Sequence, residues 1–108
     1  MITTTSIVES VEPVRDRSVI FADSYLNKLS GEKIEHECRR RIDTGCRELE
    51  LNFQNTEIVN SIGISILLGV IDTASTKGAK VVFSKVNDET VELFEMLGLT
   101  NHVVIEQS

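Results

Sequence analysis

The sequence predicts a single α/β domain in which a mixed β-sheet carries its helices mainly on one face. Short apolar runs alternate with longer segments of helical periodicity, which is typical of strands joined by helical crossovers. One expected strand, RELELNF at residues 47–53, alternates apolar and polar side chains, so one face of the sheet should stay in contact with water. The 108 residues suffice for one domain and leave no room for two, so residues 1–108 are taken as that domain.

Each expected strand is a short run of apolar or alternating residues. In residues 47–53 the side chains of Leu49, Leu51 and Phe53 should point toward the core, because successive side chains of a strand alternate between the two faces. Residues 3–10, TTTSIVES, alternate weakly and suggest an edge strand. The other expected strands are residues 18–23 (SVIFAD), 79–86 (AKVVFSKV) and 102–106 (HVVIE).

Three helices are expected between these strands. The first lies within residues 24–45, with Ser30 as a candidate cap and Gly45 as a candidate stop. The second begins near Ser61 and runs to about residue 77, and the third covers residues 89–97. Asn87 and Asp88 precede the third helix as its caps.

Charge argues against nucleic-acid and membrane-surface roles. The chain has 17 acidic and 11 basic residues, a net charge of −6, which repels phosphate backbones and anionic lipids. The arginines at 39–41 are surrounded by acidic residues and form no basic cluster. No apolar run approaches the ~20 residues that span a bilayer, and the N-terminus lacks a signal-peptide pattern. We therefore expect a cytoplasmic protein without a membrane or nucleic-acid partner.

Catalytic and metal-binding patterns are missing from the sequence. His36 and His102 stand alone and are expected on the surface, while Cys38 and Cys46 match no zinc or redox spacing. There is no glycine-rich phosphate loop, so nucleotide binding or an NTPase activity is a weak alternative. We expect no enzyme, no cofactor and no metal site.

A helical wheel over residues 61–75 places Ser61 at the start of a narrow exposed strip. The strip consists of small or polar side chains, and a broad apolar stripe on the opposite side should face the sheet. An apolar edge of two isoleucines and a valine lies beside the strip. The strip contains Ser61, Ser65, Gly69 and Asp72; the stripe Ile64, Leu67, Leu68, Ile71 and Ala74; the edge Ile62, Ile66 and Val70.

Two interpretations of Ser61 follow from the local pattern. Asn60 could be an ordinary helix cap with Ser61 as a first-turn residue, since both types favour such positions. Alternatively, Ser61 could be phosphorylated, because a helix N-terminus holds a phosphate favourably. The added charge of about −1.5 to −2 would disrupt a partner packed on the isoleucine edge.

The segment from residue 47 to residue 105 resembles the STAS family of bacterial anti-sigma factor antagonists. The family form is a strand, an Asp-Ser-Ser/Thr-Gly turn, an apolar helix, a glycine turn, a strand and a helix ending in Leu-Gly-Leu. Here the corresponding stretches are NSIG at 60–63, KGAK at 77–80, VVFSKV at 81–86 and MLGL at 96–99.

The resemblance implies that Ser61 is phosphorylated by a partner that is both anti-sigma factor and serine protein kinase, and that a serine phosphatase resets it. It also implies that the first helix turn is the docking surface. We therefore expect the partner to contact Asn60, Ser61, Ile62, Gly63, Ser65, Ile66 and Gly69.

Two residues depart from the family pattern. The family aspartate is Asn60 here, and the second hydroxyl residue is Ile62. These changes are compatible with a kinase of different preferences or with a STAS domain that is not phosphorylated. The alternative function is therefore a constitutive scaffold or accessory subunit of a stress-sensing or transport complex, motivated by the isoleucine edge.

Overall fold

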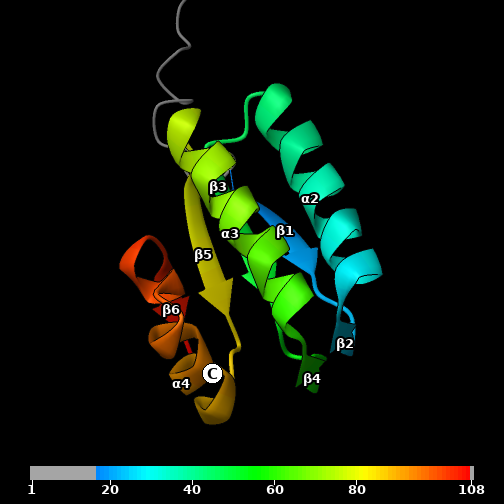
Figure 1. Ribbon diagram of the computed structural model, residues 1–108. Helices are drawn as coiled ribbons and strands as arrows, with labels where there is room; N and C mark the ends of the chain where they lie inside the picture. The colour runs from blue at the N-terminus through cyan, green and yellow to red at the C-terminus, as the bar shows by residue number, and fades with distance from the viewer. Residues whose placement is uncertain (1–16, 108) are drawn as a thin grey trace, which may run out of the picture.

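Four short parallel strands form the main sheet of the computed structural model, which describes residues 17–107 (Figure 1). They are β1 (Arg17–Phe21), β3 (Glu48–Asn52), β5 (Lys80–Ser84) and β6 (Val104–Glu106), in the order β1-β3-β5-β6. Each neighbouring pair is parallel. The described sheet is therefore parallel rather than mixed, because each pair of neighbouring strands is joined by a helical crossover. The expected edge strand at residues 3–10 lies outside the described residues.

In the part of the chain that the structure describes, three helices connect the strands, and each begins with an asparagine cap. They are α2 (Lys28–Asp43), α3 (Ser61–Thr76) and α4 (Asp88–Met96), and a short 3-10 turn, η2 (Leu99–Asn101), precedes β6. Asn27 caps α2, so the expectation that Ser30 is the cap was wrong. Ser30 instead occupies the third helical position, where its hydroxyl completes a capping box with Asn27.

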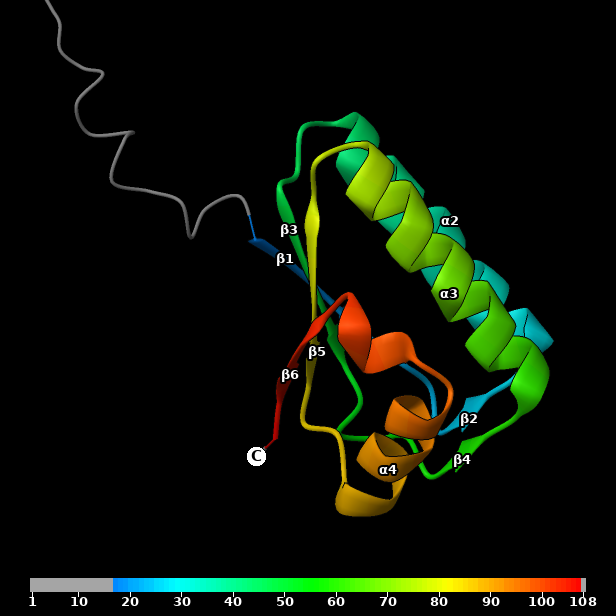
Figure 2. The same ribbon diagram turned by 60° about the vertical axis from the view of Figure 1, so that its left-hand side comes forward.

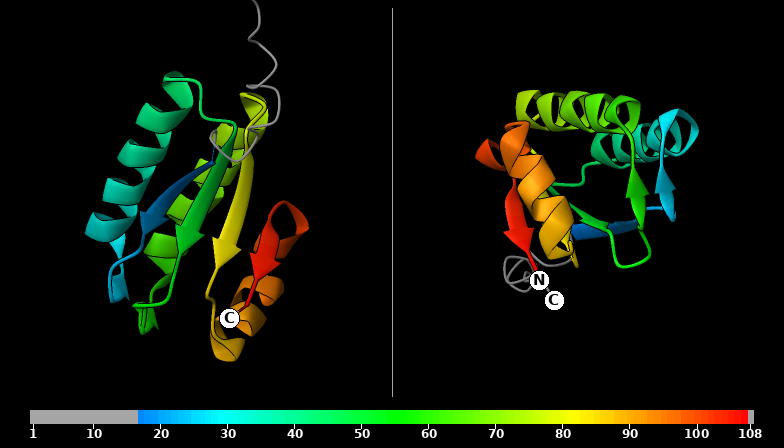
Figure 3. Two further views of the ribbon diagram at one scale, coloured as in Figure 1. Left: turned by 180° about the vertical axis from the view of Figure 1, so that it is seen from behind. Right: turned by 60° about the horizontal axis from the view of Figure 1, so that its bottom comes forward.

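The helices cover one face of the sheet, as expected. Edge-on, the strands form one layer and the helices lie on one side of it (Figure 2). The opposite view looks onto the face that α2 and α3 leave open (Figure 3, left). Alternation in β3 explains this arrangement: Leu49 and Leu51 are fully buried beneath the helices, whereas Glu48 and Glu50 are half-buried on the other face.

Three aromatic rings fill the core under α4. Phe53, Phe83 and Phe94 meet edge to face, with ring centroids 5.2 to 5.8 Å apart. All three are almost inaccessible to solvent. This geometry is the favourable one for aromatic pairs, and it anchors α4 to the ends of β3 and β5.

A second, two-stranded parallel sheet joins the starts of α2 and α3. It pairs β2 (Tyr25–Leu26) with β4 (Ile58–Val59). Neither strand was predicted, because two residues are too short to show a period. The pairing places the N-termini of the two helices side by side, at the end of the molecule where β1 and β3 finish (Figure 1).

Candidate functional site

Ser61 is the first residue of α3, and its side chain is exposed. Asn60 caps the helix, since its Oδ1 accepts a hydrogen bond of 2.8 Å from the backbone N–H of Gly63. The backbone N–H of Asn60 in turn donates to the carbonyl of Leu26 at 2.9 Å. The cap is thus tied to β2 as well as to its own helix. The interpretation of Asn60 as the helix cap is confirmed, and the cap leaves Ser61 accessible.

Gly63 allows the first turn of α3 to lie against β2. A Cβ atom at this position would come 2.7 Å from the carbonyl oxygen and 2.9 Å from the carbonyl carbon of Leu26. Real Cβ atoms essentially never approach backbone atoms so closely. Gly63 is also buried, so its place is in the packing beneath Ser61 rather than on the exposed strip.

The exposed strip lies where the wheel placed it. Ser61, Ser65, Gly69 and Asp72 are all exposed along α3. Leu68 was expected to face the sheet, but it lies on the solvent side with 39% of its surface exposed. The strip is therefore wider and more apolar than the sequence indicated.

The apolar edge beside the strip is mostly covered by α2, which contradicts the expectation of an exposed edge. Val70 is buried, and Ile66 is half-buried against Gly31 of α2, where a Cβ atom would lie 3.1 Å from the Ile66 Cδ1. Only Ile62 remains open, with 52% of its surface exposed. A wheel of one helix carries no information about a neighbouring helix, which is why this contact was missed.

Tyr25 is a member of the site that the sequence did not reveal. Its hydroxyl accepts a hydrogen bond of 3.2 Å from the Asn60 Nδ2, although the two residues are 35 positions apart. Tyr25 also borders an open groove of about 440 Å³ at the starts of α2 and α3. The groove is lined by Tyr25, Asn27, Lys28, Leu29, Glu32 and Asn60.

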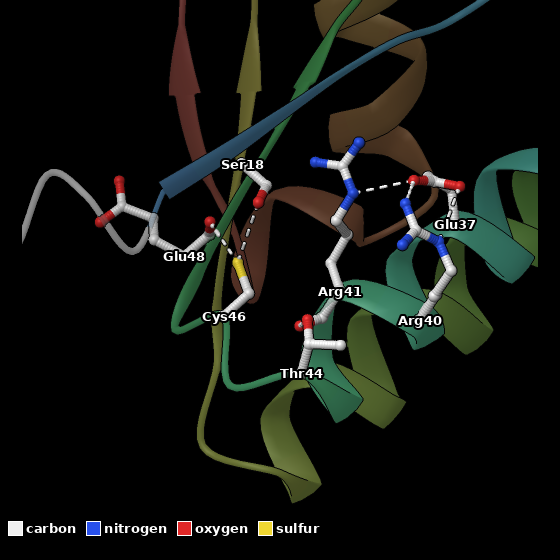
Figure 4. Close-up of polar contacts among 7 residues, drawn as sticks. All are labelled: Ser18, Glu37, Arg40, Arg41, Thr44, Cys46 and Glu48. Carbon is white, nitrogen blue, oxygen red and sulfur yellow. Dashed lines mark hydrogen bonds and ion pairs between the residues drawn. The ribbon is translucent and has the colours of Figure 1, made fainter.

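The arginines at 39–41 form no free basic surface, as expected. Arg39 pairs with Glu35, and both Arg40 and Arg41 hydrogen-bond to the Glu37 carboxylate (Figure 4). These two hydrogen bonds lower the pKa of Glu37 to about 2, and the hydrogen bond from Arg40 has the larger effect. The three guanidinium groups are thus paired within α2.

The two histidines and the two cysteines belong to no metal-binding group within the described residues. His36 and His102 are both exposed, and Cys38 is buried, which raises the pKa of its thiol to about 12. The Cys46 thiol donates to the carbonyl of Glu48, and its sulfur also lies 3.5 Å from the Ser18 hydroxyl oxygen (Figure 4). Between residues 17 and 107, no three His, Cys, Asp or Glu side chains are grouped to hold a metal ion, and no helix is long and apolar enough to cross a membrane.

A family model of the STAS domain matches residues 7–108, nearly the whole chain. This chain belongs to the STAS domain family. The expected resemblance is therefore confirmed. No curated protein sequence is similar enough to this STAS domain to count as a relative.

Solved structures of anti-sigma factor antagonists share the fold of this STAS domain. Unphosphorylated SpoIIAA is 16% identical with a TM-score of 0.69, over 87% of this chain and 82% of its own. Phosphorylated SpoIIAA from Bacillus is 18% identical with a TM-score of 0.67, over 87% and 86%. The candidate anti-sigma factor antagonist TM1081 from Thermotoga maritima is 14% identical with a TM-score of 0.75, over 86% and 80%. At these identities the likeness shows the shared fold.

Proposed function

We propose that this STAS domain is a cytoplasmic anti-sigma factor antagonist that binds an anti-sigma factor with serine kinase activity and is switched by phosphorylation of Ser61. The observation that carries the proposal is the exposed Ser61 side chain at the first position of a capped helix. A SpoIIAA structure in the phosphorylated form supports it, since that protein shares the fold. A serine phosphatase would then return the domain to its binding state.

The physical basis of the switch is the contrast between the site before and after modification. Ile58 and Ile62, close to Ser61 in the chain, are both more than half exposed, so the unmodified surface offers apolar side chains to a partner. Apolar area of this kind stabilises a protein interface. A phosphate is well accommodated by the free N–H groups of the first helical turn, but it would place charge in that apolar contact. Binding is therefore expected before phosphorylation and loss of binding after it.

The test is a phosphorylation reaction with the kinase encoded nearest to the gene, Mg-ATP and mapping of the phosphate by mass spectrometry. We expect modification at Ser61 that disappears in Ser61→Ala. Ser65→Ala is the matched control, because Ser65 is exposed one turn further along the same strip and should not affect the reaction. Ser61→Asp should weaken partner binding. An unmodified Ser61, together with unchanged affinity for Ser61→Asp, would overturn the proposal.

The alternative function of a constitutive scaffold was motivated by an apolar edge that is mostly covered. In this edge, Val70 is buried and Ile66 is half-buried by packing against α2, and only Ile62 is exposed. Ile62 directly follows Ser61, so the apolar surface left for a scaffold partner is the surface that a phosphate on Ser61 would change.

A further inference from the structure

The α3 cap differs from the caps of the other two helices in this domain. Asn27, Asn60 and Asn87 each accept a backbone N–H through Oδ1, at 3.0, 2.8 and 2.8 Å respectively. Within residues 17–107, only the Asn60 amide also bonds another side chain through its nitrogen, and that partner is Tyr25. The additional bond thus occurs at the helix that carries Ser61.

Hydrogen-bond chemistry fixes the direction of the bond between Asn60 and Tyr25. The backbone N–H of Gly63 can only donate, so the amide atom that faces it must be Oδ1. The atom that faces the Tyr25 hydroxyl is then Nδ2, and the hydroxyl oxygen is the acceptor. An amide has one oxygen and caps the helix in only one of its two orientations. The Gly63 N–H selects that orientation, and the Tyr25 hydroxyl adds a second hydrogen bond that restrains the amide in it.

Tyr25 also takes part in the cap of α2. Its backbone carbonyl accepts a hydrogen bond of 2.7 Å from the Ser30 hydroxyl, which belongs to the capping box with Asn27. Through its backbone Tyr25 therefore holds the start of α2, and through its side chain it holds the start of α3. The neighbouring Leu26 carbonyl, which accepts from the Asn60 N–H, completes the connection.

We propose that Tyr25 is a positioning residue for Ser61: by holding the Asn60 amide in its capping orientation, it fixes the first turn of α3 and hence the direction in which Ser61 is presented. Ser61 directly follows the cap, so it moves with any fraying of that turn. This inference rests on the proposed function in assigning a use to the fixed serine, but the coupling itself belongs to the isolated domain.

The STAS family pattern has an aspartate at the position of Asn60, and this difference suggests a rescue experiment. A carboxylate has two equivalent oxygens, so Asn60→Asp would cap the helix in either orientation, and its charge suits the positive end of the helix. Rotation of the side chain then replaces one capping oxygen by the other, so the cap no longer depends on the restraint from the Tyr25 hydroxyl. Tyr25→Phe should therefore loosen the first turn with Asn60 present and have much less effect in Asn60→Asp.

The test is amide hydrogen exchange by NMR on the wild type, the two single variants and the double variant. Tyr25→Phe should speed exchange of the Gly63 amide about two- to tenfold, the effect of one neutral hydrogen bond. The Thr90 amide is the internal control, since Asn87 caps it in the same way without a tyrosine. The Tyr25→Phe/Asn60→Asp variant should exchange like Asn60→Asp alone.

Three exchange results would overturn the positioning role of Tyr25. They are an unchanged exchange rate of the Gly63 amide in Tyr25→Phe, an equal rise in the exchange rate of the Thr90 amide, and a double variant whose Gly63 amide exchanges as fast as in Tyr25→Phe. With a kinase that modifies Ser61, Tyr25→Phe should lower kcat and leave KM unchanged, because it disturbs orientation rather than docking. An unaltered kcat would overturn the role in phosphorylation. If no kinase modifies Ser61, the proposed function fails, whereas the exchange result on the isolated domain still stands or falls by itself.

Discussion

Replacing Gly63 by alanine would place a methyl group where the backbone of Leu26 already lies. The new Cβ would be 2.7 Å from the Leu26 carbonyl oxygen and 2.9 Å from both its carbonyl carbon and its Cγ. A carbonyl group of a paired strand cannot rotate aside as a flexible side chain can, so either α3 or β2 must move. The hydrogen bond from the Gly63 N–H to the Asn60 cap would be disturbed by the same movement.

The expected cost follows from two opposing effects. Alanine is a better helix former than glycine and contributes about 0.5–1 kcal/mol of stability. Overpacking costs about 1–3 kcal/mol, and an obstacle made of backbone places this site at the upper end. The net expectation for Gly63→Ala is a loss of about 1–2.5 kcal/mol in the free energy of unfolding. For a domain of this size that corresponds to a Tm lower by roughly 4–20 °C.

Gly69→Ala is the matched control in the same helix. A Cβ atom there meets nothing within 4 Å, so only the helix-propensity effect remains, and this variant should be more stable by about 0.5–1 kcal/mol. Urea denaturation followed by circular dichroism measures both variants against the wild type. A Gly63→Ala protein as stable as the wild type would refute the close-approach argument, as would an equal loss for Gly69→Ala.

Three further predictions concern the core, a carboxylate and a thiol. Phe94→Ala should cost about 3–5 kcal/mol in urea denaturation, because it removes one of three interlocking rings, whereas the exposed Met96→Ala should change stability by less than about 0.5 kcal/mol. The Glu37 carboxylate should titrate near pH 2 by NMR, and Arg40→Ala should raise its pKa. Since that pKa is lowered on folding, the contribution of Glu37 to stability should be present above the unfolded pKa and disappear as the pH falls toward 2. The Cys38 thiol, whose pKa burial raises to about 12, should resist alkylation at pH 8 until the domain is unfolded, as mass spectrometry would show.

Local periodicity was enough to predict most of the fold. The alternation in residues 47–53 correctly placed Leu49 and Leu51 in the core, and the helical wheel correctly placed Ser61 and Ser65 on an exposed strip. Both patterns repeat over several residues, so each residue reinforces the others. The family pattern then identified the STAS fold, which the match over residues 7–108 confirms.

The features that were missed depend on contacts between distant parts of the chain. Tyr25 lies within a segment that the sequence assigned to the first helix, and a two-residue strand has no period to detect. The burial of Val70 results from packing between α2 and α3, which the pattern of one helix cannot express. The buried position of Gly63 likewise depends on β2. In each case the sequence pattern lacked the identity of the neighbouring element, which local helix or strand propensity does not give.

The β2–β4 pairing has a consequence for how a partner would distinguish intact copies of this protein. Tyr25 and Ile58 pair directly, although 33 positions separate them, so the surface around Ser61 is assembled from two distant pieces of the chain. A short synthetic peptide covering residues 57–72 would contain the serine but not the surroundings that hold it. Newly made or damaged copies that have not brought these pieces together would lack this surface, so a partner that recognises it would bind only correctly folded molecules.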